Sequence, residues 1–290
     1  MKNRNKKIIA LIMSGIVVLS VITGVAAEKS KSGAGEVTYN AGEEIKPNVR
    51  VMSDEGVQLE NGVDYDLSYE NNINVGTATV HITFKGNYTG TRDTNFNIVA
   101  RTLSNDSINI DDIASQTYTG AAITPEPTIK YGEVTLVKDK DYTLSYQDNI
   151  NVGTAKINIS FIGNYSGSAN TNFEITADIL NNDKVSISET AAQTYTGVAI
   201  TPEPTIKYGE VTLVKDKDYT LSYQDNVNVG TAKINVSFIG NYGGSANATF
   251  AITPKIILAD DKNISISAIE DQTYTGSPIE PQPVIIDISR

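Results

Sequence analysis

The sequence predicts an all-β protein made of antiparallel β-sandwich modules joined in tandem, and three observations predict this fold class. Asp-Tyr pairs ending at Tyr65, Tyr142 and Tyr219 recur at intervals of 77 residues. Within each interval, apolar residues alternate with polar ones at a period of two, which is the period of a half-buried strand. Clusters of Gly, Pro, Asn and Asp separate these short stretches and mark turns. About six short strands per copy is typical of a sandwich, although a closed barrel would give the same pattern.

The second copy shows the expected strands most clearly. Tyr142, Leu144 and Tyr146 fall on one face of a stretch whose other face carries Thr143 and Ser145. Stretches that alternate in this way predict strands at 108–110, 134–136, 142–146, 157–161 and 173–175. Turns are expected between them, at 125–127, 138–141, 149–153 and 163–167. No helix is expected after residue 27, and segment 176–184 is expected to be a short polar linker between copies.

The copies differ in how closely they keep the repeat. Residues 116–165 and 193–242 differ only by swaps between small aliphatic residues, which a packed core tolerates well: Ala121/Val198, Ile150/Val227 and Ile159/Val236. The first copy starts with Tyr39-Asn40-Ala41-Gly42 where the later ones have Tyr-Thr-Gly. The fourth copy restarts the motif at Gln272, and by register its Arg290 matches Val211.

This register divides the chain into one leader and four repeats. The expected domains are a signal peptide (1–27), a diverged repeat 1 (28–102), repeat 2 (103–177), repeat 3 (178–255) and an incomplete repeat 4 (256–290). The expected arrangement is extended, like beads on a string. Because repeat 4 lacks the strands that would close its core, we expect the sequence to be part of a longer protein, with further domains beyond Arg290.

The first 27 residues have the three parts of a secretory signal peptide. A basic stretch at 1–7 precedes an apolar stretch at 8–25, and the small residues Val25 and Ala27 stand at the −3 and −1 positions of a cleavage site. Cleavage is expected after Ala27. The alternative is an uncleaved membrane anchor, since about eighteen residues can almost span a bilayer. Either way, the predicted location is secreted or at the cell surface.

The composition of the 290 residues excludes several classes of protein. Without Cys the chain has no disulfide, thiol nucleophile, Cys-ligated zinc or iron–sulfur cluster, and with one His it has no His-rich metal site. Beyond the signal segment, 19 basic residues stand against 34 acidic ones, a net charge of -15. Phosphate backbones and anionic lipids would repel so acidic a chain. We therefore expect no nucleic-acid partner, and no membrane partner apart from the signal segment.

The residues that could carry chemistry do not form a recognisable catalytic site. The single imidazole, His81, is expected on the polar face of a strand, without a nucleophile or metal ligand to act with. No Gly-x-Ser-x-Gly elbow presents a nucleophile. Asp139 and Asp141 could form an acid–base pair, but they lie in an expected turn where both should be solvated. We predict no catalytic residue, metal site, cofactor or enzymatic activity, and the sequence assigns no ligand-binding residue.

Three further patterns suggest binding or crosslinking but have simpler interpretations. Segment 148–153, Asp-Asn-Ile-Asn-Val-Gly, offers oxygen ligands for calcium but lacks the spacing of an EF-hand. We interpret it as an Asx-rich turn whose side chains bond local backbone. The fifteen Tyr could stack on sugars, yet they recur in the repeat frame without any Trp, so packing is their expected role. A Lys–Asn crosslink through Lys130 or Lys207 is a further alternative, although the first copy has Arg50 nearby instead.

Together these motifs resemble the immunoglobulin-like repeats of secreted and cell-wall proteins of Firmicutes. The resemblance covers residues 36–290 and rests on Tyr-Thr-Gly, Ile-x-Pro, Lys-Asp-x-Asp-Tyr, Tyr-x-Asp-Asn-x-Asn-Val-Gly-Thr-Ala, Gly-Asn-Tyr-x-Gly and Phe-x-Ile. It implies tandem immunoglobulin-like sandwiches used as a spacer, stalk or adhesive region, often beside a separate catalytic or anchoring domain. The family has no catalytic residues to carry over to this chain.

The function we expect is that of a non-enzymatic, exported bacterial repeat protein acting as a spacer or stalk. The alternative is an adhesin or carbohydrate-binding array, in which near-identical copies bind a cell-wall or host glycan or protein weakly but many times. A third possibility is that the repeats are accessory to an enzyme domain beyond Arg290. Loss of binding when three copies are cut to one would distinguish an adhesin from a spacer.

Overall fold

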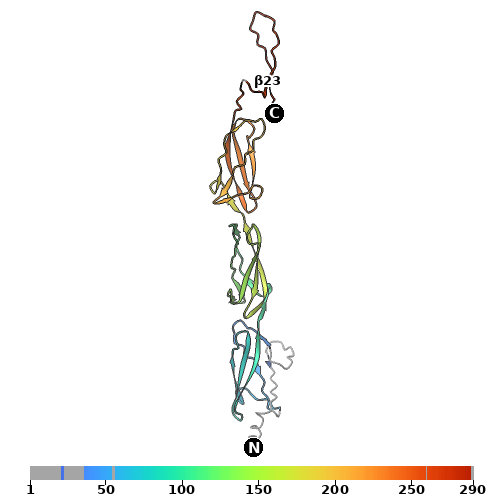
Figure 1. The fold of residues 1–290 in the computed structure, drawn as a ribbon. Helices are drawn as coiled ribbons and strands as arrows, with labels where there is room; N and C mark the ends of the chain where they lie inside the picture. Colours follow the sequence, from blue (N-terminus) through green and yellow to red (C-terminus); the bar gives the residue numbers. More distant parts are fainter. Residues whose placement is uncertain (1–20, 23–35, 54–55, 259, 289–290) are drawn as a thin grey trace. The chain divides into compact units, whose positions relative to one another are not determined.

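The chain is all-β in the computed structural model, which describes residues 21–22, 36–53, 56–258 and 260–288 (Figure 1). Within these ranges there is no α-helix, and the helical element present is a single 3-10 turn, η2 (Asn105–Ser107). Accordingly, no described helix is long and apolar enough to cross a membrane. The predicted all-β fold class, with mainly antiparallel sheets, is confirmed.

Contacts group the chain into two compact units. The first covers residues 1–115, 122–149 and 153–174, and the second covers 116–121, 150–152 and 175–290. In the predicted signal peptide, only β1 (Val21–Ile22) is described, and it pairs antiparallel with β3 (Asn48–Val49). The rest of that segment, including the predicted cleavage site, lies outside the described residues.

The first unit contains the strands of repeat 1 and most of those of repeat 2. Repeat 1 forms a four-stranded sheet with the order β2 (Glu36–Thr38), β6 (Thr91–Val99), β5 (Gly76–Phe84), β4 (Tyr65–Glu70). One sheet of repeat 2 has the order β11 (Val134–Thr135), β10 (Ile129–Tyr131), β8 (Asn109–Ile110). The other has the order β12 (Tyr142–Gln147), β13 (Gly153–Phe161), β14 (Tyr165–Thr176), β7 (Arg101–Leu103). Both β2 and β7 run parallel to their neighbours.

The second unit contains repeat 3 and the described part of repeat 4. Its larger sheet has the order β15 (Asp178–Leu180), β22 (Tyr242–Thr253), β21 (Gly230–Phe238), β20 (Tyr219–Gln224). Its three-stranded sheet has the order β16 (Val185–Ile187), β18 (Ile206–Tyr208), β19 (Val211–Thr212). Two short strands pair in parallel with the ends of β14 and β22: β9 (Gln116–Thr117) and β17 (Gln193–Thr194). Repeat 4 contributes an antiparallel pair, β23 (Ile264–Ile266) and β24 (Ile285–Asp287).

In repeat 3 the two sheets are separate and share one core, so this repeat is a sandwich. Ile206 of β18 is fully buried in a cluster with Val236 and Phe238 of β21. A second cluster joins β21 to β22, and its members are Ala232, Ile234, Phe250 and Ile252. Each Val, Ile and Phe of these clusters contributes about 1.5–3 kcal/mol by leaving water, so this core is the main source of stability in a chain without disulfides.

The alternation predicted for repeat 2 is confirmed. Tyr142 in β12 is buried, and Ile157, Ile159 and Phe161 in β13 are no more than 6% exposed, whereas Ser160 between the last two is exposed. The prediction that 176–184 is a polar linker is wrong. This segment contains β15, which pairs with β22 in parallel, and its Leu180 is fully buried in the core of repeat 3.

Candidate functional site: the contacts between successive repeats

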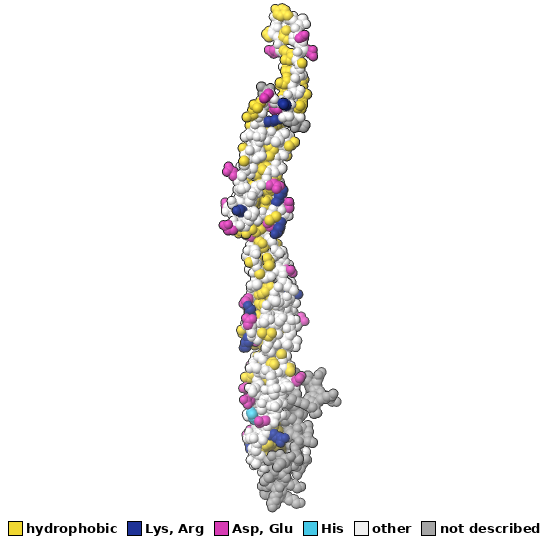
Figure 2. Space-filling model, viewed as in Figure 1, with side chains coloured by type: hydrophobic (Ala, Val, Ile, Leu, Met, Phe, Trp, Pro, Cys, Tyr) yellow, Lys and Arg dark blue, Asp and Glu magenta, His cyan; other side chains and the backbone are white. Residues whose placement is uncertain are grey.

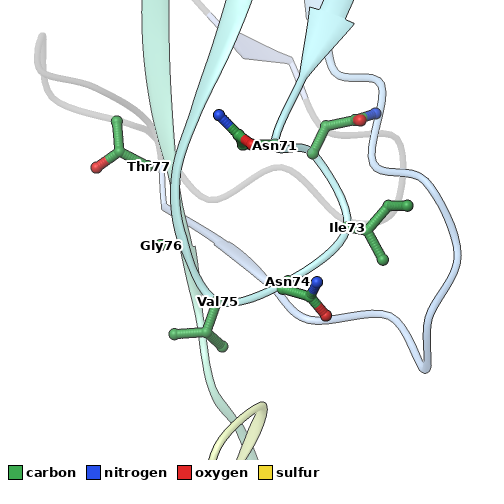
Figure 3. Close-up of a pocket in the computed structure, with 7 residues that line it drawn as sticks. Asn71, Ile73, Asn74, Val75, Gly76 and Thr77 are labelled. Carbon is green, nitrogen blue, oxygen red and sulfur yellow. The ribbon is translucent and has the colours of Figure 1, made fainter.

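Repeats 1 to 3 carry the same loop between two paired strands, which we call the asparagine loop: 71–76, 148–153 and 225–230. Its first residue has a positive φ of 55–56°, a conformation that Asn and Asp adopt more readily than other non-glycine residues. Its second residue is an Asn whose side chain donates to an upstream carbonyl oxygen: Asn72 to Ile45 (3.1 Å), Asn149 to Ile123 (3.0 Å) and Asn226 to Ile200 (2.9 Å). Figure 3 shows this loop in repeat 1, where it also lines a hollow, with Asn74 and Val75 at its turn.

Within the first unit, one side chain of repeat 2 holds the asparagine loop of repeat 1. Asn164 lies in the Gly-Asn-Tyr turn between β13 and β14. Its Oδ1 accepts a hydrogen bond from the backbone N of Val75 (2.8 Å), and its Nδ2 donates to Oδ1 of Asn74 (2.9 Å). The amide therefore uses a donor and an acceptor at once, which fixes both its position and its orientation.

Within the second unit, the same contact joins repeat 3 to the asparagine loop of repeat 2. Oδ1 of Asn241 accepts from the backbone N of Val152 (2.9 Å), and its Nδ2 donates to Oδ1 of Asn151 (2.9 Å). We call this pair of hydrogen bonds the amide clamp. A hydrogen bond contributes about 0.5–1.5 kcal/mol net, and these are exposed, so each clamp is worth roughly 1–2 kcal/mol.

The Tyr that follows each clamp Asn packs against two other rings. Tyr165 meets Tyr39 of repeat 1 edge-on, with ring centroids 5.3 Å apart, and Tyr131 of its own repeat at 6.3 Å. In the second unit, Tyr242 contacts Tyr118 (5.5 Å) and Tyr208 (6.1 Å) in the same way. Burial first, then the neighbouring Tyr39, raises the pKa of Tyr165 to about 12, so this ring stays neutral. Edge-on pairs of this kind add about 0.5–1.5 kcal/mol each to the energy of burial.

The two contacts between repeats differ in the polar residue that begins the parallel strand, which is Arg101 in β7 and Asp178 in β15. Arg101 donates from Nε to the carbonyl oxygen of Tyr39 (2.8 Å), and its guanidinium carbon lies 5.5 Å from the ring centroid of Tyr131. At the same register in repeat 3, Asp178 binds Nζ of Lys184 (2.9 Å). The hydrogen bond to Asp178 raises the pKa of Tyr208, with burial as the next cause. The clamp is therefore common to both contacts, while the surrounding charges differ.

A glycine allows the close approach of each parallel strand. Gly167 and Gly244 have φ values of +92° and +86°, and a Cβ at these positions would lie 2.4 Å from the carbonyl oxygen of Leu103 and 2.3 Å from that of Leu180. Gly90 stands at the same register in repeat 1, with a φ of +105°, and a Cβ there would meet nothing within 4 Å. At the first two positions, only a residue without a side chain lets β7 and β15 pair with β14 and β22.

His81 has partners that the sequence analysis did not assign. It lies on β5 with its side chain 37% exposed, and Nδ1 is 2.8 Å from Oδ1 of Asp93, while Nε2 is 3.4 Å from Oε2 of Glu70. The hydrogen bond to Asp93 is the largest cause that raises the pKa of His81, and Glu70 raises it further. Figure 2 shows the imidazole beside acidic side chains. This arrangement bridges three adjacent strands electrostatically, and in the register of β4 and β5 the residue opposite His81 is Ser68.

The expectation that Asp139 and Asp141 are both solvated is wrong for Asp141. Asp139 is exposed with a φ of +64°, but Asp141 is only 7% exposed and its Oδ2 accepts a hydrogen bond from the backbone N of Val137 (2.9 Å). The carboxylate is buried because it closes the turn before β12. Asp218 repeats this contact with Val214 at 2.8 Å.

The side chains of segment 148–153 were predicted to bond the backbone of their own turn, but two of them bond residues far away in the sequence. Asn149 bonds the carbonyl of Ile123, and Asn151 bonds Asn241 of the next repeat, so two of the oxygen-bearing side chains proposed for calcium already serve the fold. Groups of three or more His, Cys, Asp or Glu that could hold a metal ion are absent from the described residues.

Several tyrosine hydroxyls have protein partners, as buried tyrosines require. Tyr69, Tyr146 and Tyr223 each donate to a proline carbonyl oxygen: Pro47 (2.8 Å), Pro125 (2.9 Å) and Pro202 (2.8 Å). Burial is the largest cause that raises the pKa of all three. Tyr274 in repeat 4 differs, since it is 89% exposed.

No protein-family model matches the sequence, and no curated protein matches it. Among solved structures, the immunoglobulin domains 1–5 of Sidekick-1 align with 83% of this chain and 60% of their own, at 10% identity and a TM-score of 0.25. Domains 4–9 of the surface layer protein SbsC align with 87% and 41%, at 13% identity and a TM-score of 0.20. The chain thus spans less than two thirds of either structure. Similarity this low carries no argument, and the fold class rests on the strands themselves.

Proposed function

We propose that this chain is a non-enzymatic, exported bacterial repeat protein whose repeats act as a spacer or stalk. The observation that carries the proposal is the amide clamp, which appears twice with bond lengths of 2.8–2.9 Å. A spacer needs each module to be attached to the next in the same way, so that reach increases by a constant step. Identical contacts formed by Asn164 and Asn241 meet that need, whereas binding to a ligand would not require them.

The exposed surface supports the same proposal through its charge. The mature chain is strongly acidic, and like charges keep the outer faces of neighbouring modules soluble and apart. The predicted signal peptide supports export of the chain. Because the chain has no Cys, an exported stalk of this kind would fold outside the cytoplasm without having to form disulfides.

An adhesin array is the alternative, and one observation favours it. Repeats 2 and 3 present nearly the same exposed side chains, so Val137 and Val214, for instance, are each 52% exposed at one register position. A surface copied in this way suits a repeated weak ligand on a glycan or protein. The experiment below distinguishes the two functions.

The test removes one repeat without changing the clamp. Deleting residues 101–177 joins Ala100 to Asp178, so that Asn241 meets Asn74 and Val75 as Asn164 does in the natural chain. A spacer predicts that the maximum dimension from small-angle X-ray scattering falls by the length of one repeat, with no change in retention on purified cell-wall glycan. A fall in retention of about tenfold or more on deletion would instead indicate multivalent adhesion and overturn the spacer function.

A further inference from the structure

Tyrosine rings gather at each contact between successive repeats. They form two clusters, which we call the tyrosine triads: Tyr39, Tyr131 and Tyr165 in the first unit, and Tyr118, Tyr208 and Tyr242 in the second. In each triad one ring belongs to the earlier repeat and two belong to the later one. Packing alone would be satisfied by Phe, which offers the same aromatic surface. The phenol groups therefore bring a chemistry to these contacts that packing does not use.

The composition of the repeats directs oxidation to tyrosine. The sulfur side chains of Cys and Met and the indole of Trp are the other groups that oxidants readily attack. Beyond residue 27 the sequence has fifteen Tyr but no Cys, no Trp and a single Met, Met52. A radical formed in repeats 2 and 3 therefore ends on a tyrosine.

The rings that face each other across a contact are close enough to be joined. Tyr118 and Tyr242 have centroids 5.5 Å apart and planes at 88°, and Tyr39 and Tyr165 have centroids 5.3 Å apart and planes at 90°. In edge-on pairs of this kind, the edge of one ring is in van der Waals contact with the other ring. Burial first, then Tyr118, raises the pKa of Tyr242, so the hydroxyl ends of these two rings are close as well. Phenols couple through the Cε carbons next to the hydroxyl.

The second triad also has a base that can take up a phenol proton. The hydroxyl of Tyr208 is hydrogen-bonded to Asp178, whose side chain is only 14% exposed and binds Nζ of Lys184 at 2.9 Å. A phenol that loses an electron becomes a strong acid, so a bonded carboxylate lets its electron and proton leave together. At the same register the first triad has Arg101, whose positive charge lies 5.5 Å from the ring centroid of Tyr131 and opposes loss of an electron there.

We propose that the second tyrosine triad is a modification site, at which oxidation joins Tyr118 of repeat 2 to Tyr242 of repeat 3 by a carbon–carbon bond. The oxidant is hydrogen peroxide acting through a haem peroxidase. One peroxide takes an electron and a proton from each of two phenols and becomes two water molecules. Tyr208 is oxidised first and recovers a hydrogen atom from Tyr242, whose ring centroid is 6.1 Å away.

The bond forms when both phenols of the facing pair are radicals. Their Cε carbons couple, and the hydrogen on each of these carbons then moves to the oxygen of the same ring. The product is a biphenol with both hydroxyl groups restored. It gives this contact a covalent link in a chain that has no disulfide. The benefit of such a link rests on the proposed spacer function, because a stalk needs repeats that do not separate, whereas the reaction itself does not depend on it.

The test treats the full chain with hydrogen peroxide and a haem peroxidase and isolates the monomeric product. We expect this product to have lost the mass of two hydrogen atoms for each link, and digestion to release joined peptides that contain Tyr118 and Tyr242. This link should form at least about tenfold faster than one between Tyr39 and Tyr165, which lacks a bonded carboxylate. Tyr118→Phe should abolish the link. Tyr274→Phe, which changes a ring that is 89% exposed and outside both triads, should leave it unchanged.

Variants of Asp178 test the proton acceptor. Asp178→Asn is expected to slow the Tyr118–Tyr242 link by at least about tenfold, and Asp178→Glu is expected to keep it near its natural rate. The Tyr39–Tyr165 pair in the same molecules is the internal control, since neither variant should change its rate. Tyrosine links found only between chains would overturn the proposal, as would a Tyr118–Tyr242 link that forms no faster than the control. These results concern covalent mass, whereas the spacer test measures length and glycan retention, so the two proposals can fail separately.

Discussion

Replacing Gly244 by Ala tests the close approach of β15 to β22. The substitution has two costs. A φ of +86° costs a residue with a Cβ about 1–2 kcal/mol, and the new atom would lie 2.3 Å from the carbonyl oxygen of Leu180. Because backbone must move to relieve this overlap, overpacking adds about 1–3 kcal/mol. The expected loss in the free energy of unfolding of repeat 3 is therefore about 2–5 kcal/mol.

Two matched variants isolate the overlap from the strained φ. Gly90→Ala has a similar φ of +105° but no atom within 4 Å, so its expected loss is only about 1–2 kcal/mol. Gly243→Ser places its Cβ against the flexible end of Ile179 and matches Ser166 of repeat 2, so its expected loss is below about 1 kcal/mol. Denaturant unfolding followed by hydrogen exchange would assign each loss to its repeat. If Gly244→Ala lowers the free energy of unfolding no more than Gly90→Ala does, the close approach of β15 to β22 is refuted.

Three further predictions follow from the core, the imidazole and the asparagine loop. Phe250→Ala should destabilise repeat 3 by about 3–5 kcal/mol in denaturant unfolding, because Phe250 is 2% exposed; a loss below about 1 kcal/mol would mean that this core is not packed as described. The raised pKa of His81 means that its pairing stabilises repeat 1 fully below about pH 6.5 and that this stabilisation is lost as pH rises through the folded-state pKa. The melting temperature should therefore fall as pH rises through the folded-state pKa, and His81→Asn should remove this fall. An unchanged pH dependence in His81→Asn would exclude this histidine as its source. Millimolar calcium should leave the melting temperature unchanged, and a rise of several degrees would instead show a calcium site in segment 148–153.

The parts of the fold that depend on neighbours in sequence could be predicted. Alternation placed Ile157, Ile159 and Phe161 on the buried face of β13, because every second side chain of a strand points the same way. The turn at 138–141 was also recognisable from its composition. The burial of Asp141 within it was not, since that depends on one hydrogen bond to Val137.

The contacts between repeats could not be predicted, because they join residues far apart in the chain. Asn164 and Asn74 are separated by 90 positions, and each lies in a segment that reads as an ordinary turn. Similarly, Leu180 is one of few apolar residues in a polar stretch, so nothing local indicated that β15 would pair with β22. One signal was available: Gly-Asn-Tyr and Asn-Val-Gly recur together in each complete copy. Because polar turn residues are not needed to form a core, their recurrence indicates a different shared role.

The most direct test of the account asks whether the amide clamp fixes successive repeats. Because the natural chain has no Cys, spin labels can be attached at Ser68→Cys and Ser145→Cys, two exposed positions at the same register of repeats 1 and 2. Pulsed electron–electron double resonance on the full chain should give one narrow distribution of the distance between the two labels, and Asn164→Ala should broaden it. A distribution equally broad with and without Asn164 would contradict the claim that the clamp joins the repeats into a spacer.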